Sequence, residues 1–261
     1  MRGNIMKESI RGYIQLALVV ASAGVIYPIA YIKNNYQETL LEVYNISLQD
    51  LNTIFLALGI ISVITYFPSG ILCDKFSCKW LLVISLTGTA AAGVWFAMVP
   101  QFEFIVVIYM LWGIFSILTF WAAHMKLIKL LARPEEQGRF FGILDGGRGL
   151  IEAVLGVIAV ALFAKFMGSN PGAAEKHSAM VALVWLYTIA IVIVTILIVI
   201  FMEGVCSGRH RLHGLFSHLD TVLLQRIFTD QHWHRPCNRW RGNDCGIVAA
   251  SCGWFCRRFC W

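Results

Sequence analysis

The chain has 261 residues, of which 58% are hydrophobic and 14% are charged, and its formal net charge at pH 7 is +6. A water-soluble domain of this size cannot bury so large a share of apolar side chains, so the composition excludes an ordinary soluble globular protein. The alternating pattern of a membrane β-barrel is also absent from the sequence, which leaves an all-α membrane protein as the predicted fold class.

Six apolar runs follow one another along the chain, and each is long enough to cross about 30 Å of hydrocarbon as a helix. Because lipid offers no partners for free backbone amide and carbonyl groups, we expect all six to be helical. The runs cover, approximately, Tyr13 to Ile32, Leu51 to Cys73, Trp80 to Val99, Phe104 to Ala123, Phe140 to Phe166 and Ala179 to Phe201.

The first run has an alternative interpretation, since Arg2, Lys7 and Arg11 precede it as the basic residues of a cleavable secretory signal would. The apolar stretch continues to Ile32, however, which is the length of a spanning helix and too long for a signal core. We therefore prefer a first transmembrane helix.

Two tyrosines one helical turn apart, Tyr27 and Tyr31, lie near the end of this first run. Side chains of this amphipathic kind line solute cavities, but they also form the aromatic belt at a membrane interface. The sequence leaves both roles open for them.

A short polar hinge, residues 70–79, separates the second apolar run from the third. It contains Gly70, Leu72, Asp74, Lys75 and Lys79. With this spacing the hinge resembles the signature loop of the Major Facilitator Superfamily, roughly G-x-L-x-D-R/K-x-G-R/K-R/K, which joins the second and third helices of those secondary transporters. The sequence departs from that pattern at two positions, because Ser77 replaces a usual glycine and Cys78 a usual basic residue.

The resemblance implies a six-transmembrane-helix bundle that corresponds to the amino-terminal half of such a transporter, built as two inverted three-helix repeats. It also implies that Gly70, Asp74, Lys75 and Lys79 form a gating loop on the cytoplasmic side. There the aspartate would cap helix amides and help to hold the two halves of the transporter together in one state of its cycle. The expected partner of this loop lies in a second six-helix half, which is missing from this chain.

Aromatic and basic side chains gather at the end of the fourth run, as they do where a helix is anchored among lipid headgroups. A proton relay through His124 is the alternative, but the sequence gives this histidine no partner. The group consists of Trp121, His124, Lys126 and Lys129.

The fifth run carries the densest polar signal, because Asp145, Arg148 and Glu152 fall within about 60° of one another on a helix. A charge near mid-membrane costs at least about 2.5 to 3.5 kcal/mol unless it faces water or a partner, so we expect this stripe to point away from lipid. Arg148 would bind an anionic group of a solute. Glu152, with Asp145 as the second candidate, would carry a coupling proton. The alternative is a buried ion triad that orders helices without contacting a solute.

Three glycines in the same run repeat every fourth residue: Gly138, Gly142 and Gly146. This spacing lets a neighbouring helix approach the backbone closely. We therefore expect packing to be their main role.

Residues 204–261 differ in composition from residues 1–203, since they contain no Lys, Glu, Tyr or Met but hold six of the eight cysteines. We expect the resemblance to end at Glu203 and the Cys/Trp/Arg-rich tail to be disordered or translated in a shifted reading frame. The alternative is a metal site in the tail, although no Cys-x-x-Cys or His-x-x-x-His pair occurs there. Its ligands would be His232, His234, Cys237 and Cys245.

Basic residues of the six-span arrangement gather on one side of the membrane. The positive-inside rule makes this side cytoplasmic, so we expect both ends of the six-helix body there, in the cytoplasmic (inner) membrane of a bacterium. The positive net charge then needs no nucleic-acid partner. The residues are Arg2, Lys7, Arg11, Lys75, Lys79, Lys126, Lys129, Arg133 and Arg139.

Taken together, these patterns predict a secondary active transporter that moves a small solute, an organic or inorganic anion, across the bilayer by alternating access with proton coupling. One six-helix half builds one wall of a pathway, so we expect a truncated form that either pairs with itself as a homodimer or is inactive. A membrane-tethered metal-binding protein is the remaining alternative. No phosphate-binding glycine loop, metalloprotease helix or nucleophile elbow occurs, so we expect no enzymatic activity, no cofactor and no metal in the body.

Overall fold

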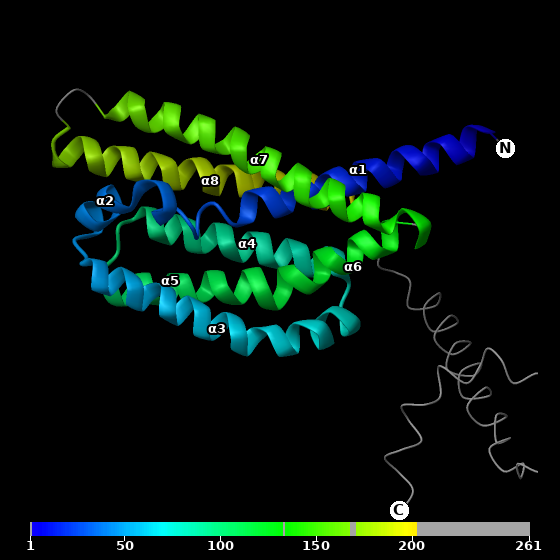
Figure 1. The fold of residues 1–261 in the computed structure, drawn as a ribbon, viewed down its shortest axis with the longest axis horizontal. Helices are drawn as coiled ribbons and strands as arrows, with labels where there is room; N and C mark the ends of the chain where they lie inside the picture. The colour runs from blue at the N-terminus through cyan, green and yellow to red at the C-terminus, as the bar shows by residue number, and fades with distance from the viewer. Residues whose placement is uncertain (1, 133, 168–170, 203–261) are drawn as a thin grey trace, which may run out of the picture. The chain divides into compact units, whose positions relative to one another are not determined.

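The computed structural model describes residues 2–132, 134–167 and 171–202, and the regular structure within these ranges is entirely helical (Figure 1). The tail from residue 203 onward lies outside the described residues. The predicted shift of reading frame and the alternative metal site of the tail therefore stay predictions.

Eight α-helices occur in the described residues. A π-helical segment, Ile114–Trp121, joins the fifth helix to the sixth, so that Phe102–Leu131 is one continuous rod. One 3-10 turn, Pro134–Glu136, precedes the seventh. The helices are α1 Arg2–Ile26, α2 Lys33–Tyr44, α3 Leu48–Lys75, α4 Cys78–Ala97, α5 Phe102–Gly113, α6 Ala122–Leu131, α7 Gln137–Phe166 and α8 Ala173–Phe201.

Five helical stretches in the described part of the chain are long and apolar enough to cross a membrane, and a shorter apolar stretch, Gly12–Ile26, accompanies them. The five correspond to the second through sixth predicted runs. They are Leu48–Lys75, Cys78–Ala97, Phe102–Leu131, Pro134–Phe166 and Ala173–Phe201. This confirms an integral membrane protein of the predicted fold class.

The first predicted run is helical only as far as Ile26, and the residues from Tyr27 to Ile32 form turns instead. Pro28 explains the difference, because proline lacks an amide hydrogen and disfavours the α conformation of the residue before it. Pro68, by contrast, lies inside α3.

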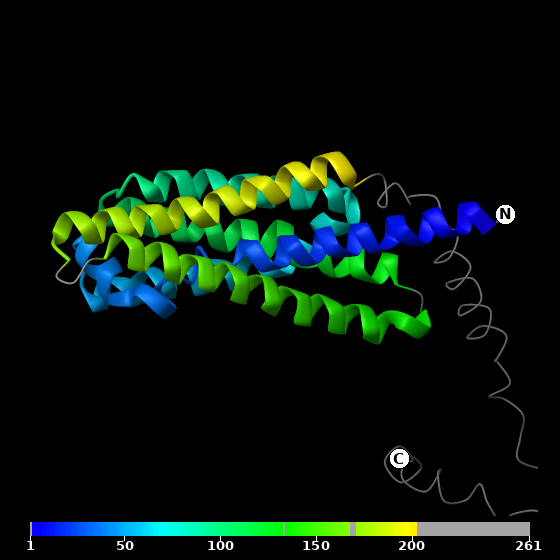
Figure 2. The same ribbon diagram turned by 90° about the horizontal axis from the view of Figure 1, so that it is seen from above.

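The helices form two groups of three, and helices that correspond in chain order run in opposite directions in the two groups (Figures 1 and 2). The first group is α1, α3 and α4, and the second is the α5–α6 rod, α7 and α8. The contacts between the groups show the same symmetry. In chain order α1 corresponds to the α5–α6 rod, α3 to α7 and α4 to α8. The contact of α1 with α7 is therefore matched by the contact of α5 with α3, and α4 contacts its own counterpart α8. This is the pattern expected of two inverted three-helix repeats.

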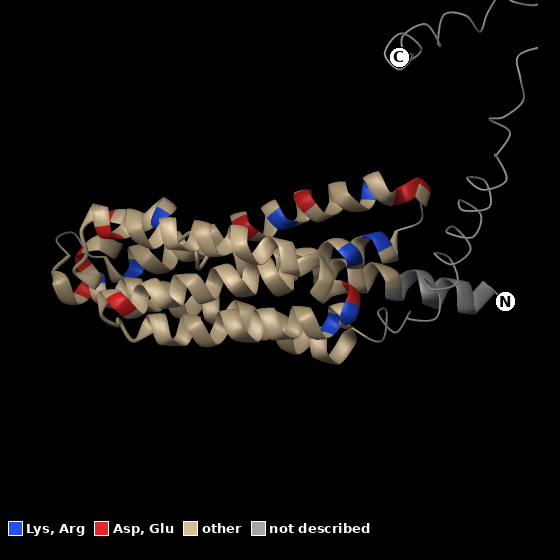
Figure 3. Ribbon diagram, turned by 90° about the horizontal axis from the view of Figure 1, so that it is seen from below, with Lys and Arg blue, Asp and Glu red and all other residues tan. Residues whose placement is uncertain are grey.

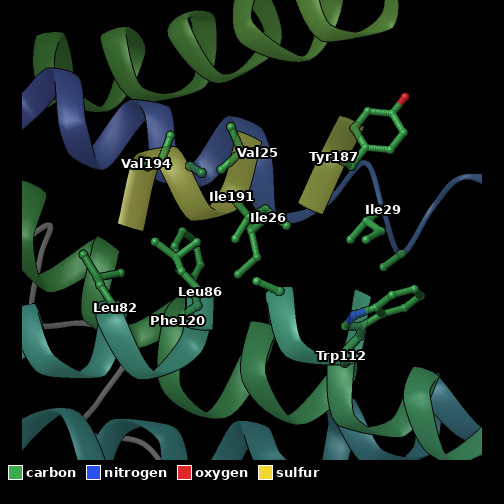
Figure 4. Close-up of a cluster of buried hydrophobic side chains, with 14 of the residues drawn as sticks. Val25, Ile26, Ile29, Leu82, Leu86, Trp112, Phe120, Tyr187, Ile191 and Val194 are labelled. Atoms are coloured by element: carbon green, nitrogen blue, oxygen red, sulfur yellow. The ribbon is translucent and has the colours of Figure 1, made fainter. Parts of the chain in front are cut away.

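Close packing between helices holds this bundle together, because in lipid the hydrophobic effect does not drive one apolar helix against another. Ile26, Leu86 and Ile191 are almost completely buried where α1, α4 and α8 meet (Figure 4). Gly93 allows the close approach of α4 to α8, since a Cβ atom at this position would lie 2.6 Å from the hydroxyl oxygen of Thr188. The relative position of α4 and α8 is therefore determined by close steric packing.

The short helix α2 lies between the first two spans in the chain and contacts α4 and α8. The Tyr44 hydroxyl donates a hydrogen bond to the Phe96 carbonyl at 2.9 Å, and the two rings stack with centroids 4.5 Å apart. Burial raises the pKa of Tyr44 well above its ordinary value, so the phenol stays a neutral donor. Lys176 of α8 forms an ion pair with Glu42 of α2.

Charged residues concentrate at the two ends of the bundle, and one helix carries charged residues between the ends (Figure 3). That helix is α7, which holds Asp145, Arg148 and Glu152. The middle of α7 is therefore the candidate functional site.

Candidate functional site

The charged side chains of α7 lie in the middle of this helix, and their predicted depth in the membrane stays a prediction. At about 1.5 Å per residue, Arg148 is about 17 Å and Glu152 about 22 Å from the first residue of α7. Arg148 Nε lies 3.8 Å from Glu152 Oε1, and these side chains are 39% and 38% exposed. Asp145 is exposed, and none of the ion pairs found in the described residues involves it. The structure thus shows a half-exposed Arg148–Glu152 pair in place of a buried triad.

The exposed surface of α7 consists of two chemically different sectors, which successive residues reach at about 100° per residue. The apolar sector contains Leu150, Val154 and Val157, which are 67%, 52% and 71% exposed. The second sector adjoins the charged side chains and contains Gly138, Gly142, Gly146 and Gly149. An apolar sector of this kind suits lipid, whereas charges and bare backbone suit water or a protein partner.

The glycines of the second sector lie apart from the other described helices. A Cβ atom added to Gly138, Gly142 or Gly146 would meet no described atom within 4 Å. The close approach between α1 and α7 depends instead on Gly24 and Gly147, where an added Cβ would lie 2.7 Å from the Ile151 Cβ atom and 2.5 Å from the Val20 Cγ1 atom, respectively. These glycines therefore contact no described helix of this bundle, and their packing role stays a prediction.

The residues that follow α1 bring a phenol toward this region. The rings of Tyr27 and Tyr31 are 6.5 Å apart. Gly24, three residues before Tyr27, lies against α7, since a Cβ atom added there would be 3.3 Å from the Arg148 carbonyl oxygen. The Tyr27 hydroxyl and Arg148 Nε are both buried and have no hydrogen-bond partner among the described residues. Leaving a buried polar atom without a partner costs about 1–3 kcal/mol, so each of these two atoms is a candidate contact for water or a polar ligand.

A row of rings continues from Tyr27 into the fourth span. Tyr27 meets Phe120 edge to face at 6.2 Å, and Phe120 stacks on His124 at 4.7 Å. Phe120 lies near the end of the π-helical segment, a rare geometry that often marks functional sites. Sequence reasoning missed Phe120 and the π-helix, because nothing in the residue types signals this geometry.

His124 does not anchor the helix among headgroups, since the residue is only 3% exposed. Its Nδ1 lies 3.2 Å from the Phe120 carbonyl oxygen, one turn earlier in the same rod. The partner that the sequence alone could not identify is therefore the backbone and ring of Phe120.

The signature loop contacts other residues of this six-helix body, and its expected partner in a second half stays a prediction. Lys126 of α6 donates hydrogen bonds to Asp74 Oδ1 at 2.8 Å and to the Cys73 carbonyl at 3.0 Å. The last carbonyls of a helix lack intrahelical donors. Lys126 therefore caps the end of α3 and neutralises Asp74 at the same time.

A second lysine caps a helix in the same manner. Lys79 Nζ donates a hydrogen bond at 3.0 Å to the carbonyl of Val199, which belongs to the last turn of α8. Lys75 and Gly70 are exposed, and a Cβ added to Gly70 would meet no described atom within 4 Å. The four predicted gating residues are thus adjacent in sequence but have different surroundings.

Metal ligation finds no support in the described ranges, since they contain no group of three or more His, Cys, Asp or Glu side chains that could hold an ion. What the site offers chemically is a guanidinium, a carboxylate, a phenol and a row of aromatic rings. Such a set can bind a small organic or inorganic anion and exchange a proton with water.

Comparison with protein-family models gives a match to the Major Facilitator Superfamily over residues 12–256. The match therefore continues past Glu203, where we expected the resemblance to end. The proposed change of reading frame in the tail stays a prediction.

Several proteins of known sequence resemble the chain over part of their length. Inner membrane protein YqcE of Escherichia coli (strain K12) is 27% identical over 225 residues, which are 85% of this chain and 52% of that protein. Inner membrane protein YihN of the same strain is 24% identical over 70% of this chain and 42% of its own length. The uncharacterized MG294 homolog of Mycoplasma pneumoniae is 31% identical over 57% of this chain and 33% of its own length. The chain thus spans about half the length of these relatives or less, and no solved structure matches it.

Proposed function

Since the chain belongs to the Major Facilitator Superfamily, we propose that it forms the solute-binding wall of a secondary transporter that moves a small anion across the inner membrane by alternating access. The names of the two Escherichia coli relatives, both inner membrane proteins, support the location. The observation that carries the proposal is the pair of buried polar atoms, Tyr27 hydroxyl and Arg148 Nε, that lack partners in the described residues.

Arg148 is the proposed anion ligand. Its guanidinium offers several donors in a planar fork, which suits a carboxylate or a phosphate. The contact between Arg148 and Glu152 is loose at 3.8 Å, so Glu152 does not hold the guanidinium in a short hydrogen bond. A solute anion can therefore compete with Glu152 for Arg148, and the Tyr27 hydroxyl can donate a further hydrogen bond.

Glu152 is the proposed site of the coupling proton, with Asp145 as the second candidate. When an anion occupies Arg148, the displaced carboxylate loses its cationic partner, which favours the protonated form. Anion binding and proton uptake would then be linked in the same step. This linkage is the simplest route to symport of a proton with an anion.

The opposite wall is proposed to come from another six-helix bundle, either a second half or a second copy of this chain. The uncovered glycine sector of α7 supports this, because it lets another helix approach the backbone beside the charged residues. Crosslinking of Gly142→Cys in membranes distinguishes the two sources, since a second copy would give a disulfide-linked dimer of this chain.

The signature loop is proposed to gate the pathway. Asp74 and Lys79 are bound within the bundle in the present state. Lys75 is exposed and remains available to a partner bundle in the same state. Movement of the loop would exchange the Lys126 contact for one across the pathway.

Uptake of a labelled anion panel, organic carboxylates and phosphate esters, into proteoliposomes that contain the chain tests the proposal. Arg148→Gln is expected to lower uptake of the accepted anion by about tenfold or more, since a charge-assisted hydrogen bond is worth about 1.5–3 kcal/mol. Arg139→Gln is the matched control, because Arg139 is exposed near the start of the same helix. Equal uptake by Arg148→Gln and the unaltered chain, or no uptake of any anion, would contradict the proposal.

Proton coupling has its own measurement in the same vesicles. Glu152→Gln is expected to retain exchange of labelled for unlabelled anion while losing accumulation driven by a pH gradient. If accumulation persists in Glu152→Gln but disappears in Asp145→Asn, the coupling site moves to Asp145. If it persists in both variants, neither carboxylate carries the proton.

A further inference from the structure

Two thiols lie side by side at the junction of α3 and α4. Cys73 belongs to the last turn of α3, and Cys78 is the first residue of α4. Their sulfur atoms are 3.9 Å apart, and the two residues are 3% and 1% exposed. The contact exists because α3 ends at Lys75 and α4 begins only three residues later, so the chain reverses within a very short turn.

Cys78 is also a position at which this sequence departs from the signature loop it resembles. A basic residue is usual there, and the thiol is a feature of this chain. The resemblance to the signature loop therefore does not account for the two adjacent thiols.

Those surroundings favour thiol chemistry. The Lys126 ammonium donates a hydrogen bond to the Cys73 carbonyl, and the two thiols lie close enough to interact electrostatically with this lysine. Cys78 occupies the first turn of α4, where free amides and the helix dipole favour an anion. A thiolate is the nucleophile in thiol–disulfide exchange, and a nearby ammonium and free helix amides favour it, whereas burial of the sulfur opposes it until the turn opens.

We propose that Cys73 and Cys78 form a dithiol site that closes to an intramolecular disulfide on reaction with a low-molecular-weight disulfide such as oxidised glutathione. Bond formation requires the sulfur atoms to approach by about 2 Å to the usual S–S length of about 2.05 Å. Side-chain rotation together with a small shift of the turn supplies a movement of this size.

The reaction proceeds in two exchanges. The Cys78 thiolate attacks one sulfur of the external disulfide, forms a mixed disulfide and releases one thiolate, which takes up the proton lost by Cys78. The Cys73 thiolate then attacks the Cys78 sulfur and expels the second external thiolate, which takes up the Cys73 proton. One external disulfide is reduced to two thiols, and the two cysteines are oxidised to one disulfide.

The disulfide would fix the end of α3 to the start of α4 around the exposed residues Asp74, Lys75 and Phe76. Both sulfur atoms are buried, so the oxidant reaches them only when this turn opens. Closure is therefore expected to be slower than oxidation of an exposed thiol and reversible by dithiothreitol.

The experiment uses the full chain in detergent with the six cysteines of the tail replaced by serine, which leaves only Cys73 and Cys78. After treatment with oxidised glutathione, intact-mass spectrometry is expected to show the loss of two hydrogen atoms, and alkylation under denaturing conditions to find no free thiol. Cys73→Ser and Cys78→Ser, each lacking one partner, are expected to keep a free thiol or to gain one glutathionyl group.

Three results would overturn the proposal. These are two free thiols after treatment, a glutathionyl group on each cysteine, or disulfide-linked dimers in place of the intramolecular bond. Because the readout is covalent mass and not transport, it is independent of the solute and of the proposed function.

Discussion

Replacing Lys126 by methionine removes two interactions of one ammonium group while keeping the length of the side chain. The first is the ion pair with Asp74 at 2.8 Å, and the second is the hydrogen bond to the Cys73 carbonyl at 3.0 Å. Asp74→Asn removes only the ionic part of the first. A double-mutant cycle over these two positions therefore separates the two contributions.

Solvent exposure decides which contribution is larger. Two unit charges 2.8 Å apart attract by about 1.5 kcal/mol in bulk water, before the entropy of holding both side chains is subtracted. The Asp74 side chain is 79% exposed and that of Lys126 is 28% exposed, so the pair falls in the class of surface ion pairs, worth about 0.2–1 kcal/mol. The hydrogen bond from Lys126 to the Cys73 carbonyl, at the buried end of α3, satisfies a carbonyl that has no intrahelical donor. This hydrogen bond stabilises the fold by about 1.5 kcal/mol or more.

Lys126→Met is therefore expected to lower the free energy of unfolding by about 2 kcal/mol, and Asp74→Asn by less than about 1 kcal/mol. The coupling energy of the cycle should also stay below about 1 kcal/mol. Reversible unfolding in mixed micelles, followed by circular dichroism, measures all three. Lys129→Met is the matched control, because Lys129 is exposed on the same helix.

Two results would refute this reasoning. If Lys126→Met is as stable as Lys129→Met, the lysine does not cap α3. If Asp74→Asn lowers the free energy of unfolding as much as Lys126→Met does, the ion pair contributes more than the hydrogen bond to the Cys73 carbonyl. The classification of the Lys126–Asp74 pair as a weak surface ion pair is then wrong.

Three further changes test the packing and the caps by the same unfolding measurement. Gly24→Ala is expected to destabilise the bundle by about 1–3 kcal/mol through the clash with Ile151, whereas Gly142→Ala should be neutral or slightly stabilising, and the reverse order would contradict the assignment of the two α7 faces. Tyr44→Phe should cost about 1 kcal/mol and Tyr44→Ala about 3–5 kcal/mol, so equal losses would show that the stacked ring contributes nothing. Lys79→Met should lower the free energy of unfolding by about 1–2 kcal/mol, because the Val199 carbonyl in the last turn of α8 loses its donor. An unchanged stability would show that Lys79 does not cap α8.

Sequence patterns sufficed for the spanning helices because hydropathy and segment length are local properties. Five predicted runs lie largely within the observed helices. The helix predicted for the first run ends at Ile26 instead of Ile32, because hydropathy does not record the backbone restriction that Pro28 imposes on Tyr27. The length of an apolar run therefore overestimated the length of a helix.

The candidate site was predicted less completely, because its parts come from separate spans. The angular relation of Arg148 to Glu152 follows from helix geometry within one segment and could be predicted. The approach of Gly24 to the Arg148 backbone, and the burial of His124 against Phe120, depend on how α1, α6 and α7 pack. The glycine pattern of α7 is equally compatible with a packed and an open face, so the sequence alone could not decide whether a helix of this chain covers it.

The most direct test of the central claim is the accessibility of α7 in native membranes. In a background without other cysteines, Asp145→Cys, Arg148→Cys and Glu152→Cys are compared with Val154→Cys and Val157→Cys for reaction with a membrane-impermeant maleimide applied to each side of the membrane. We predict that the three polar-face cysteines react about tenfold faster or more than the two apolar-face ones, since only water supports the reactive thiolate. Slow reaction at 145, 148 and 152 with no difference from 154 and 157 would show that this face of α7 lies in lipid, and would contradict a solute pathway along it.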